Sequence, residues 1–197
     1  MPLNIDFLSP KLQYRRKHAS LRNEAIARAI GLKPKDHPLL VDATAGLAND
    51  SFILAALGFE LILLERSPIL YPLLQSALQN ASQDSEVAPI IKRLHLIQAD
   101  AIHWLTYCHP QPDVILLDPM FPKRSKSAKT RQTFLLLCDL IGKDEDADIL
   151  FHQARACALK RVVVKRPRRA KPLANFKPSF QLIGKSARFD IYLTGKN

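Results

Sequence analysis

Four apolar runs of strand length, each ending in an acidic residue, restrict the fold of this chain more than any other feature of its sequence. The runs end at Asp42, Glu65, Asp100 and Asp118, and segments with helical spacing of apolar residues follow the first, second and fourth. Strands that alternate with helices and are apolar on both faces are typical of a parallel sheet covered by helices on both sides. The sequence therefore predicts the α/β class.

The remaining elements follow from the same spacing rules. Strands are predicted at residues 38–42, 60–65, 95–100, 113–118 and 161–165, followed by an antiparallel hairpin at 180–193. Helices are predicted at residues 21–30, 50–57, 69–80, 130–141 and 147–158. We therefore expect a mostly parallel, seven-stranded sheet in one domain at residues 21–197. Residues 1–20 are expected to form an irregular arm or the remnant of a larger N-terminal subdomain.

The composition and the cysteines indicate the compartment. The 197 residues suffice for one domain with a substantial core, and no apolar run approaches the roughly eighteen residues that a membrane helix needs. The three cysteines are scattered, with no CxxC spacing and no histidine placed to complete a zinc site. We therefore predict reduced thiols, no metal, no membrane contact and a cytoplasmic location.

Positive charge is concentrated in two runs that contain no acidic residue. Lysine and arginine number 29 against 18 aspartate and glutamate, which gives a formal net charge of +11. Residues 123–131 hold five of these cations and residues 160–171 hold seven. Such clusters attract a phosphate backbone, although either run alone is equally consistent with a solvated basic face. Two such runs close to predicted strands favour polyanion binding.

The acidic strand ends predict where a ligand binds, because open α/β sheets bind ligands outside the carboxyl ends of their strands. Asp42 and Asp50 flank a turn of small residues with one glycine, Gly46, where a dinucleotide fingerprint requires three. A cationic ligand without phosphate, such as S-adenosylmethionine (SAM), suits this turn. Glu65 would then hold the ribose diol and Asp100 the adenine amino group. NAD remains the competing cofactor, since Glu65 could hold its ribose equally well.

The end of the fourth strand favours SAM. Asp118, Pro119 and Phe121 belong to a DPMF sequence that resembles the [DN]-P-P-[FY] motif of methyltransferases acting on exocyclic amines of bases. A carboxylate and a rigid backbone carbonyl can accept the two N–H bonds of such an amine, and a phenylalanine ring can stack on the base. We therefore predict Asp118, Pro119 and Phe121 as catalytic residues.

Several motifs in order along the chain resemble one family, ribosomal RNA small subunit methyltransferase J. They are VDATAGL at 41–47, LLER at 63–66, LDPMFP at 117–122, DAD at 146–148, KRVVVKRP at 160–167, PLAN at 172–175 and RFDIY at 188–192. The resemblance implies a Rossmann-like class I methyltransferase that methylates the N2 amino group of one guanine in 16S rRNA, with SAM as its cofactor. The cofactor contacts that it implies are Asn49, Asp50, Glu65, Arg66, Asp100, Ala101 and Asp118, in addition to Asp42 and Gly46 from the turn.

The chain departs from the family pattern at three places. It has Ala48 and Asn49 where Gly-Arg is common, residues 123–125 read KRS where a His-Lys-Gln type of run is common, and residues 168–170 read RRA in place of a more neutral segment. Members of the family are also typically longer at the N-terminus. These departures concern Asn49 and the RNA contacts rather than the reaction.

The leading hypothesis is therefore an rRNA guanine-N2 methyltransferase whose partner is 16S rRNA or the small ribosomal subunit, with no DNA substrate. An adenine-N6 methyltransferase and a non-catalytic RNA-binding assembly factor remain open, and a dehydrogenase is the weakest alternative. The residues predicted to bind RNA are Lys123, Arg124, Lys126, Arg166, Arg168 and Arg169.

Overall fold

The computed structural model describes residues 4–119, 146–184 and 187–195. Its sheet has seven strands in the order β3-β2-β1-β4-β5-β7-β6. The first five strands in the sequence pair in parallel, whereas β7 is antiparallel to both β5 and β6. The strands are β1 (Leu40–Asp42), β2 (Leu61–Glu65), β3 (Leu94–Gln98), β4 (Val114–Leu117), β5 (Arg161–Pro167), β6 (Phe180–Ile183) and β7 (Ala187–Leu193). The predicted α/β class, the seven strands and the C-terminal hairpin are confirmed.

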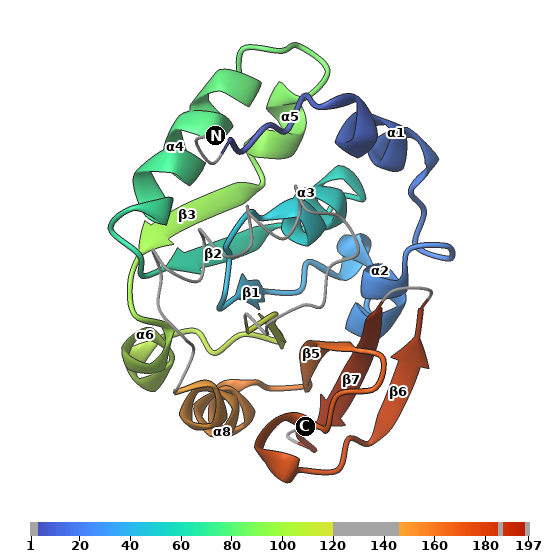
Figure 1. Ribbon diagram of the computed structural model, residues 1–197, viewed down its shortest axis with the longest axis vertical. Helices are drawn as coiled ribbons and strands as arrows, with labels where there is room; N and C mark the ends of the chain where they lie inside the picture. Colours follow the sequence, from blue (N-terminus) through green and yellow to red (C-terminus); the bar gives the residue numbers. More distant parts are fainter. Residues whose placement is uncertain (1–3, 120–145, 185–186, 196–197) are drawn as a thin grey trace.

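Seven α-helices are described alongside the sheet. They are α1 (Pro10–His18), α2 (Ala25–Ile30), α3 (Asn49–Ala56), α4 (Leu70–Ala81), α5 (Ala88–Ile91), α6 (Ala101–Tyr107) and α8 (Ala147–Cys157). Figure 1 shows α6 and α8 side by side at one face of the sheet. The helix predicted at 130–141 lies outside the described residues. No helix in the described ranges is long and apolar enough to cross a bilayer.

The core has two parts, one on each face of the sheet. Leu40, Leu63 and Leu116 pack with the helices from α1 to α5, whereas Val41 and Ile115 pack with α6 and α8. This alternation follows from the period of two along a strand, which sends neighbouring side chains to opposite faces. Burial on both faces explains why the central strands are continuously apolar in sequence.

The N-terminal segment is more regular than predicted. Residues 10–18 form α1, which starts at Pro10, and Leu12 is its buried residue. Phe7 is 1% exposed and its ring stacks on Phe52 of α3, with the ring centroids 5.2 Å apart. Because α1 buries one apolar side chain, it lacks the repeating apolar spacing on which helix prediction depends. The expectation of an irregular arm is wrong for residues 10–18, whereas the domain boundary at residue 20 stays a prediction.

Two element boundaries and two short helices also differ from the prediction. The helix predicted from residue 21 begins at Ala25, and the short helix α5 was not predicted. The third strand ends at Gln98, because Asp100 caps the unpredicted helix α6 by accepting a hydrogen bond from the backbone N of His103 at 3.0 Å. An aspartate before a helix is a recognised N-cap, since it satisfies a backbone N–H that has no partner within the helix.

Candidate active site

The carboxyl ends of the central strands surround one cavity. β1 lies between β2 and β4, so the chain leaves β1 toward β2 and β3 on one side and reaches β4 and β5 on the other. Such a switch in strand order opens a crevice at the carboxyl edge. The cavity there has a volume of about 500 Å³, which is within the usual range for a small-molecule site.

The structure brings the predicted cofactor residues together around this cavity. Its lining includes Asp42, Gly46, Asn49, Asp50, Glu65, Arg66, Asp100, Ala101 and Asp118. Pro119, predicted as catalytic, also lines it. Phe121, Lys123, Arg124 and Lys126 lie outside the described residues, so their roles stay predictions.

The predicted RNA-binding arginines separate into two groups. Arg168 and Arg169 are exposed on the turn that follows β5. Arg166 is 6% exposed, lines the cavity, and donates hydrogen bonds from Nε and Nη2 to the carbonyl of Lys171 at 3.2 and 2.6 Å. Arg166 therefore braces the turn between residues 166 and 171 and does not present an open phosphate-binding surface.

The turn after β1 brings its backbone close to the cavity. Gly46 has φ +53°, and its N–H donates to Glu65 Oε2 at 3.1 Å. Ala48 also has a positive φ, 51°, in the left-handed region that favours glycine. Ala48 therefore adopts a backbone conformation for which glycine is the easier residue.

Glu65 is buried at the end of β2 and organises two backbone segments. Its Oε2 accepts from Gly46 N, and its Oε1 accepts from Ser67 N at 2.8 Å. The side chain is therefore held rigidly in the cavity wall, at the end of the strand next to β1.

Arg66 also lines the cavity and pairs with Asp146 and Asp100. Its guanidinium donates to both carboxylate oxygens of Asp146, with Nη2 3.2 Å from Oδ1, and Nη1 is 3.6 Å from Asp100 Oδ2. The Arg66 guanidinium lowers the pKa of Asp146 through this hydrogen bonding. Asp146 also lines the cavity, so Arg66 connects the ends of β2, β3 and the start of α8.

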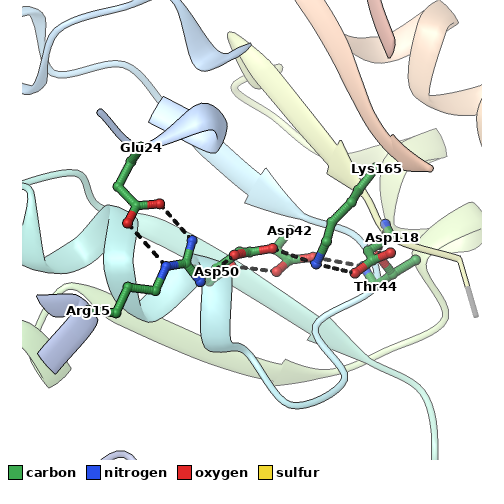
Figure 2. A network of polar contacts seen from close by, with 8 residues as sticks. Arg15, Glu24, Asp42, Thr44, Asp50, Asp118 and Lys165 are labelled. Atoms are coloured by element: carbon green, nitrogen blue, oxygen red, sulfur yellow. Dashed lines mark hydrogen bonds and ion pairs between the residues drawn. The ribbon is translucent and has the colours of Figure 1, made fainter. Parts of the chain in front are cut away.

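A chain of alternating charges (Figure 2) leads from α1 to the part of the cavity wall that contains Asp50, Lys165 and Asp118. Arg15 of α1 donates to both carboxylate oxygens of Glu24, at 3.1 and 2.8 Å, and to Asp50 Oδ1 at 2.8 Å. Lys165 of β5 then donates from Nζ to Asp50 Oδ2 at 2.6 Å and to Asp118 Oδ2 at 2.8 Å. The chain therefore extends from the N-terminal helix to the predicted catalytic carboxylate.

The pKa directions in this chain follow from burial and partner charges. Burial alone would raise the pKa of Asp50, but Lys165 and Arg15 outweigh it and the net direction is down. Burial alone would lower the pKa of Lys165, but Asp50 and Asp118 outweigh it and the net direction is up. Asp50 is therefore a carboxylate and Lys165 an ammonium at neutral pH.

Asp42 supports the same wall from the end of β1. It is 8% exposed and accepts hydrogen bonds from Ser51 Oγ and from Thr44 N, the latter at 3.1 Å. The Thr44 hydroxyl in turn accepts from the backbone N of Asp118 at 2.6 Å. Burial, together with smaller contributions from the charges of Asp118 and Asp50, raises the pKa of Asp42 to about 6 despite these hydrogen bonds.

Replacing Asp42 with asparagine is expected to change how stability depends on pH. The raised pKa means that folded Asp42 holds its proton up to about pH 6, whereas in the unfolded chain an aspartate loses it near 4. The contribution of Asp42 to stability is therefore complete below pH 4 and is lost as the pH rises through 6.

Relative to wild type, Asp42→Asn should gain about 2 kcal/mol in unfolding free energy between pH 4.5 and 7.5. Urea unfolding across this range measures the difference. A difference that stays constant with pH would contradict the raised pKa.

Sequence reasoning missed Lys165, Arg15 and Thr44 as members of the site. For Lys165 a signal existed, because it follows the apolar residues of a strand in the same way as the acidic strand ends. For Arg15 there was none, since its contact with Asp50 spans 35 positions and depends on how α1 packs.

The donor set fits SAM. A carboxylate at the end of β2 and another before α6 suit its ribose diol and adenine amine, and the acidic wall suits its sulfonium. Leu70, Ile102 and Leu150 also line the cavity and offer apolar surface suited to an adenine ring. Among the described residues no group of three or more His, Cys, Asp or Glu side chains is arranged to hold a metal ion.

Comparisons with known proteins agree with this geometry. A family model described as a putative SAM-dependent methyltransferase matches residues 1–194. A protein named ribosomal RNA small subunit methyltransferase J from Thioalkalivibrio sulfidiphilus is 48% identical over 98% of this chain and 77% of its own length. The protein of the same name from Nitrosococcus oceani is 47% identical, with the same coverages.

Solved structures agree as well. A SAM-dependent methyltransferase from Neisseria gonorrhoeae superposes with a TM-score of 0.77 at 34% identity, over 98% of this chain and 75% of that one. The rRNA methyltransferase aviRa from Streptomyces viridochromogenes, with a TM-score of 0.55 at 15% identity, covers 88% of this chain and 84% of its own and shares the fold. The chain therefore belongs to the ribosomal RNA small subunit methyltransferase J family, and it is a methyltransferase whose cofactor is S-adenosylmethionine.

Proposed function

We propose that this protein transfers a methyl group to the exocyclic N2 amine of a guanine in 16S rRNA, either free or within the small ribosomal subunit. The observation that carries the proposal is the place of Asp118, which lines the cofactor cavity with a side chain that is 41% exposed. A carboxylate in this position can reach both the cofactor and an entering base. The names of the relatives, which specify rRNA of the small subunit, support the substrate class.

The chain's own residues would act mainly by positioning. Asp118 accepts one N–H bond of the amine, and the rigid Pro119 segment supplies a carbonyl for the other. When SAM is bound it supplies an electrophilic methyl group, so the amine lone pair forms the N–C bond as the S–C bond breaks, sulfur keeps that electron pair, and nitrogen then loses a proton to water. Holding the amine in line with the methyl group supplies most of the rate enhancement.

The residues of the cavity wall would form two groups, each of which binds a different part of the cofactor. Glu65 and Asp100 hold the ribose and adenine, whereas Asp50, Asp42 and the turn at Gly46 form the acidic side that receives the sulfonium and the methionine portion. Asn49, Arg66 and Ala101 complete the cofactor contacts. A target base would be unstacked from the RNA to reach the cavity, as enzymes that modify bases require.

Transfer of labelled methyl from SAM to ribosomal RNA tests the proposal. The substrate is offered as free 16S rRNA and as small subunits, and the modified nucleoside is then identified. N2-methylguanosine in either substrate is the expected product. N6-methyladenosine would establish the adenine alternative, and binding of RNA without any transfer would establish the assembly factor.

Arg168 and Arg169 are proposed to contact the phosphate backbone, together with Lys123, Arg124 and Lys126. Replacing Arg168 and Arg169 with alanine should weaken RNA binding and reduce the slope of log affinity against log salt by about 1 to 2, because each phosphate contact releases a counterion. Fluorescence anisotropy at several salt concentrations measures the slope.

A matched control is the double replacement of Lys33 and Lys35 with alanine, since both are exposed and precede the amino end of β1, whereas Arg168 and Arg169 follow the carboxyl end of β5. An unchanged slope in the arginine variant would show that this turn is a solvated basic face that does not contact RNA.

We also propose a cytoplasmic location, which was predicted from the cysteines and accords with an RNA substrate.

A further inference from the structure

Lys165 connects two carboxylates that belong to different parts of the site. The pairing of Leu117 with Val164 places the residues after them, Asp118 and Lys165, beside each other at the carboxyl ends of β4 and β5. Lys165 Nζ lies 2.8 Å from Asp118 Oδ2 and 2.6 Å from Asp50 Oδ2. Its side chain is 26% exposed, so the ammonium is partly shielded from water and its interactions are stronger than those of a surface pair.

The surrounding ion pairs leave Lys165 as the described cation that holds Asp118. Asp50 is also paired with Arg15, and Arg15 is also paired with Glu24. Within the described part of the chain, Lys165 is the cation paired with Asp118, and Asp118 Oδ1 has no hydrogen-bond partner. One oxygen of the carboxylate is therefore occupied and the other is available.

The chemistry of Lys165 excludes a role as a proton acceptor. Asp50 and Asp118 raise its pKa, so it keeps its proton at neutral pH and cannot take one from the substrate amine. Without the ammonium, Asp50 and Asp118 would face each other as like charges in a partly buried wall. Such carboxylates repel each other and move apart, so Asp118 would no longer be held in the orientation that aims Oδ1 at a substrate amine.

We propose that Lys165 is a positioning residue for methyl transfer, whose ammonium holds Oδ2 of Asp118 so that Oδ1 stays fixed and available to accept from the substrate amine. This inference rests on the proposed function. It goes beyond that function by assigning the orientation of the catalytic carboxylate to a residue of the neighbouring strand. Lys165 acts through Asp118 and does not touch the methyl group.

The test compares Lys165→Met, Lys165→Arg and wild type in single-turnover methyl transfer to ribosomal RNA. Lys165→Met should lower the rate of transfer at saturating substrates by about 50-fold, the size of effect that a small misplacement of a catalytic group produces. The dissociation constant for SAM, measured by calorimetry without RNA, should change less than fivefold. Lys165→Arg keeps the charge and should stay within fivefold of wild type in rate.

A double-variant cycle separates this role from a general effect on folding. In the Asp118→Ala background, measured with enzyme in excess, Lys165→Met should lower the rate of methyl transfer by less than threefold, because the carboxylate that Lys165 positions is absent. The matched control is Lys160→Met at the amino end of β5, where Lys160 pairs with Asp113 at 2.9 Å. This variant removes an aspartate-paired lysine away from the cavity, and its rate should stay within twofold of wild type.

Two results would overturn the inference. One is a Lys165→Met rate within threefold of wild type, and the other is a full 50-fold loss that persists in the Asp118→Ala background. If Lys165→Met does not fold, Lys165→Gln keeps a hydrogen-bond donor without the charge and must meet the same two criteria. If wild type transfers no methyl group to ribosomal RNA, the proposed function fails instead, so the two failures are distinguishable.

Discussion

Asp118→Ala is expected to lower the rate of methyl transfer to ribosomal RNA by about 1,000-fold, while RNA affinity stays within about twofold of wild type. Asp118 lines the cavity at the end of β4, and Lys165 already occupies its Oδ2. Loss of one preorganised electrostatic contact to the reacting group typically costs 10²–10³-fold in rate. RNA affinity should be insensitive, because phosphate contacts dominate it and one base amine adds little.

Single-turnover transfer with labelled SAM measures the rate, and fluorescence anisotropy measures RNA affinity. Asp36→Ala is a suitable control, since Asp36 is exposed in the short 3₁₀ segment Pro34–Asp36 that precedes β1, and its rate should match wild type within twofold. Thermal unfolding of Asp118→Ala confirms that the variant is folded during the assay. A rate of methyl transfer within tenfold of wild type would show that Asp118 is not a catalytic residue.

Glu65→Gln is expected to weaken SAM binding by roughly 100-fold, the second largest effect among these variants. Both oxygens of Glu65 accept backbone hydrogen bonds, from Gly46 N and Ser67 N. Glutamine replaces one acceptor oxygen with an NH₂ group, which opposes a backbone N–H and cannot accept from the ribose diol. Hydrogen bonds to a charged group contribute about 1.5–3 kcal/mol each, so the loss of one or two corresponds to this change in affinity.

Calorimetry of SAM binding measures the effect without RNA and without turnover. The matched control is Glu60→Gln, because Glu60 is exposed at the residue before β2 begins and Glu65 ends the same strand. The control should bind SAM within twofold of wild type. A Glu65→Gln affinity within threefold of wild type would show that Glu65 shapes the turn at Gly46 without holding the cofactor.

Local sequence signals were sufficient for the parallel sheet, the hairpin and the edge at which the cavity lies. Apolar runs of strand length indicate strands that are buried on both faces. The acidic residue that ends each run indicates the carboxyl end of the strand, where open α/β sheets bind ligands. They were insufficient for α1 and α6. Helix α1 buries one apolar residue, so it lacks an apolar repeat. Helix α6 is capped by Asp100, which follows an apolar run and was therefore interpreted as the last residue of a strand.

Strand order, by contrast, was decided in the tertiary structure. Hydrophobic spacing does not specify that β5 lies next to β4, and that adjacency brings Lys165 to Asp118 across 47 positions and to Asp50 across 115. The packing of α1 on α3 likewise brings Arg15 to Asp50.

The sequence by itself therefore determined the fold class and the acidic residues at the strand ends around the cavity, because each of these depends on residues close together in the chain. Only the tertiary structure decided which cations meet those acids, because an ion pair between distant residues depends on the register and order of the strands that carry them.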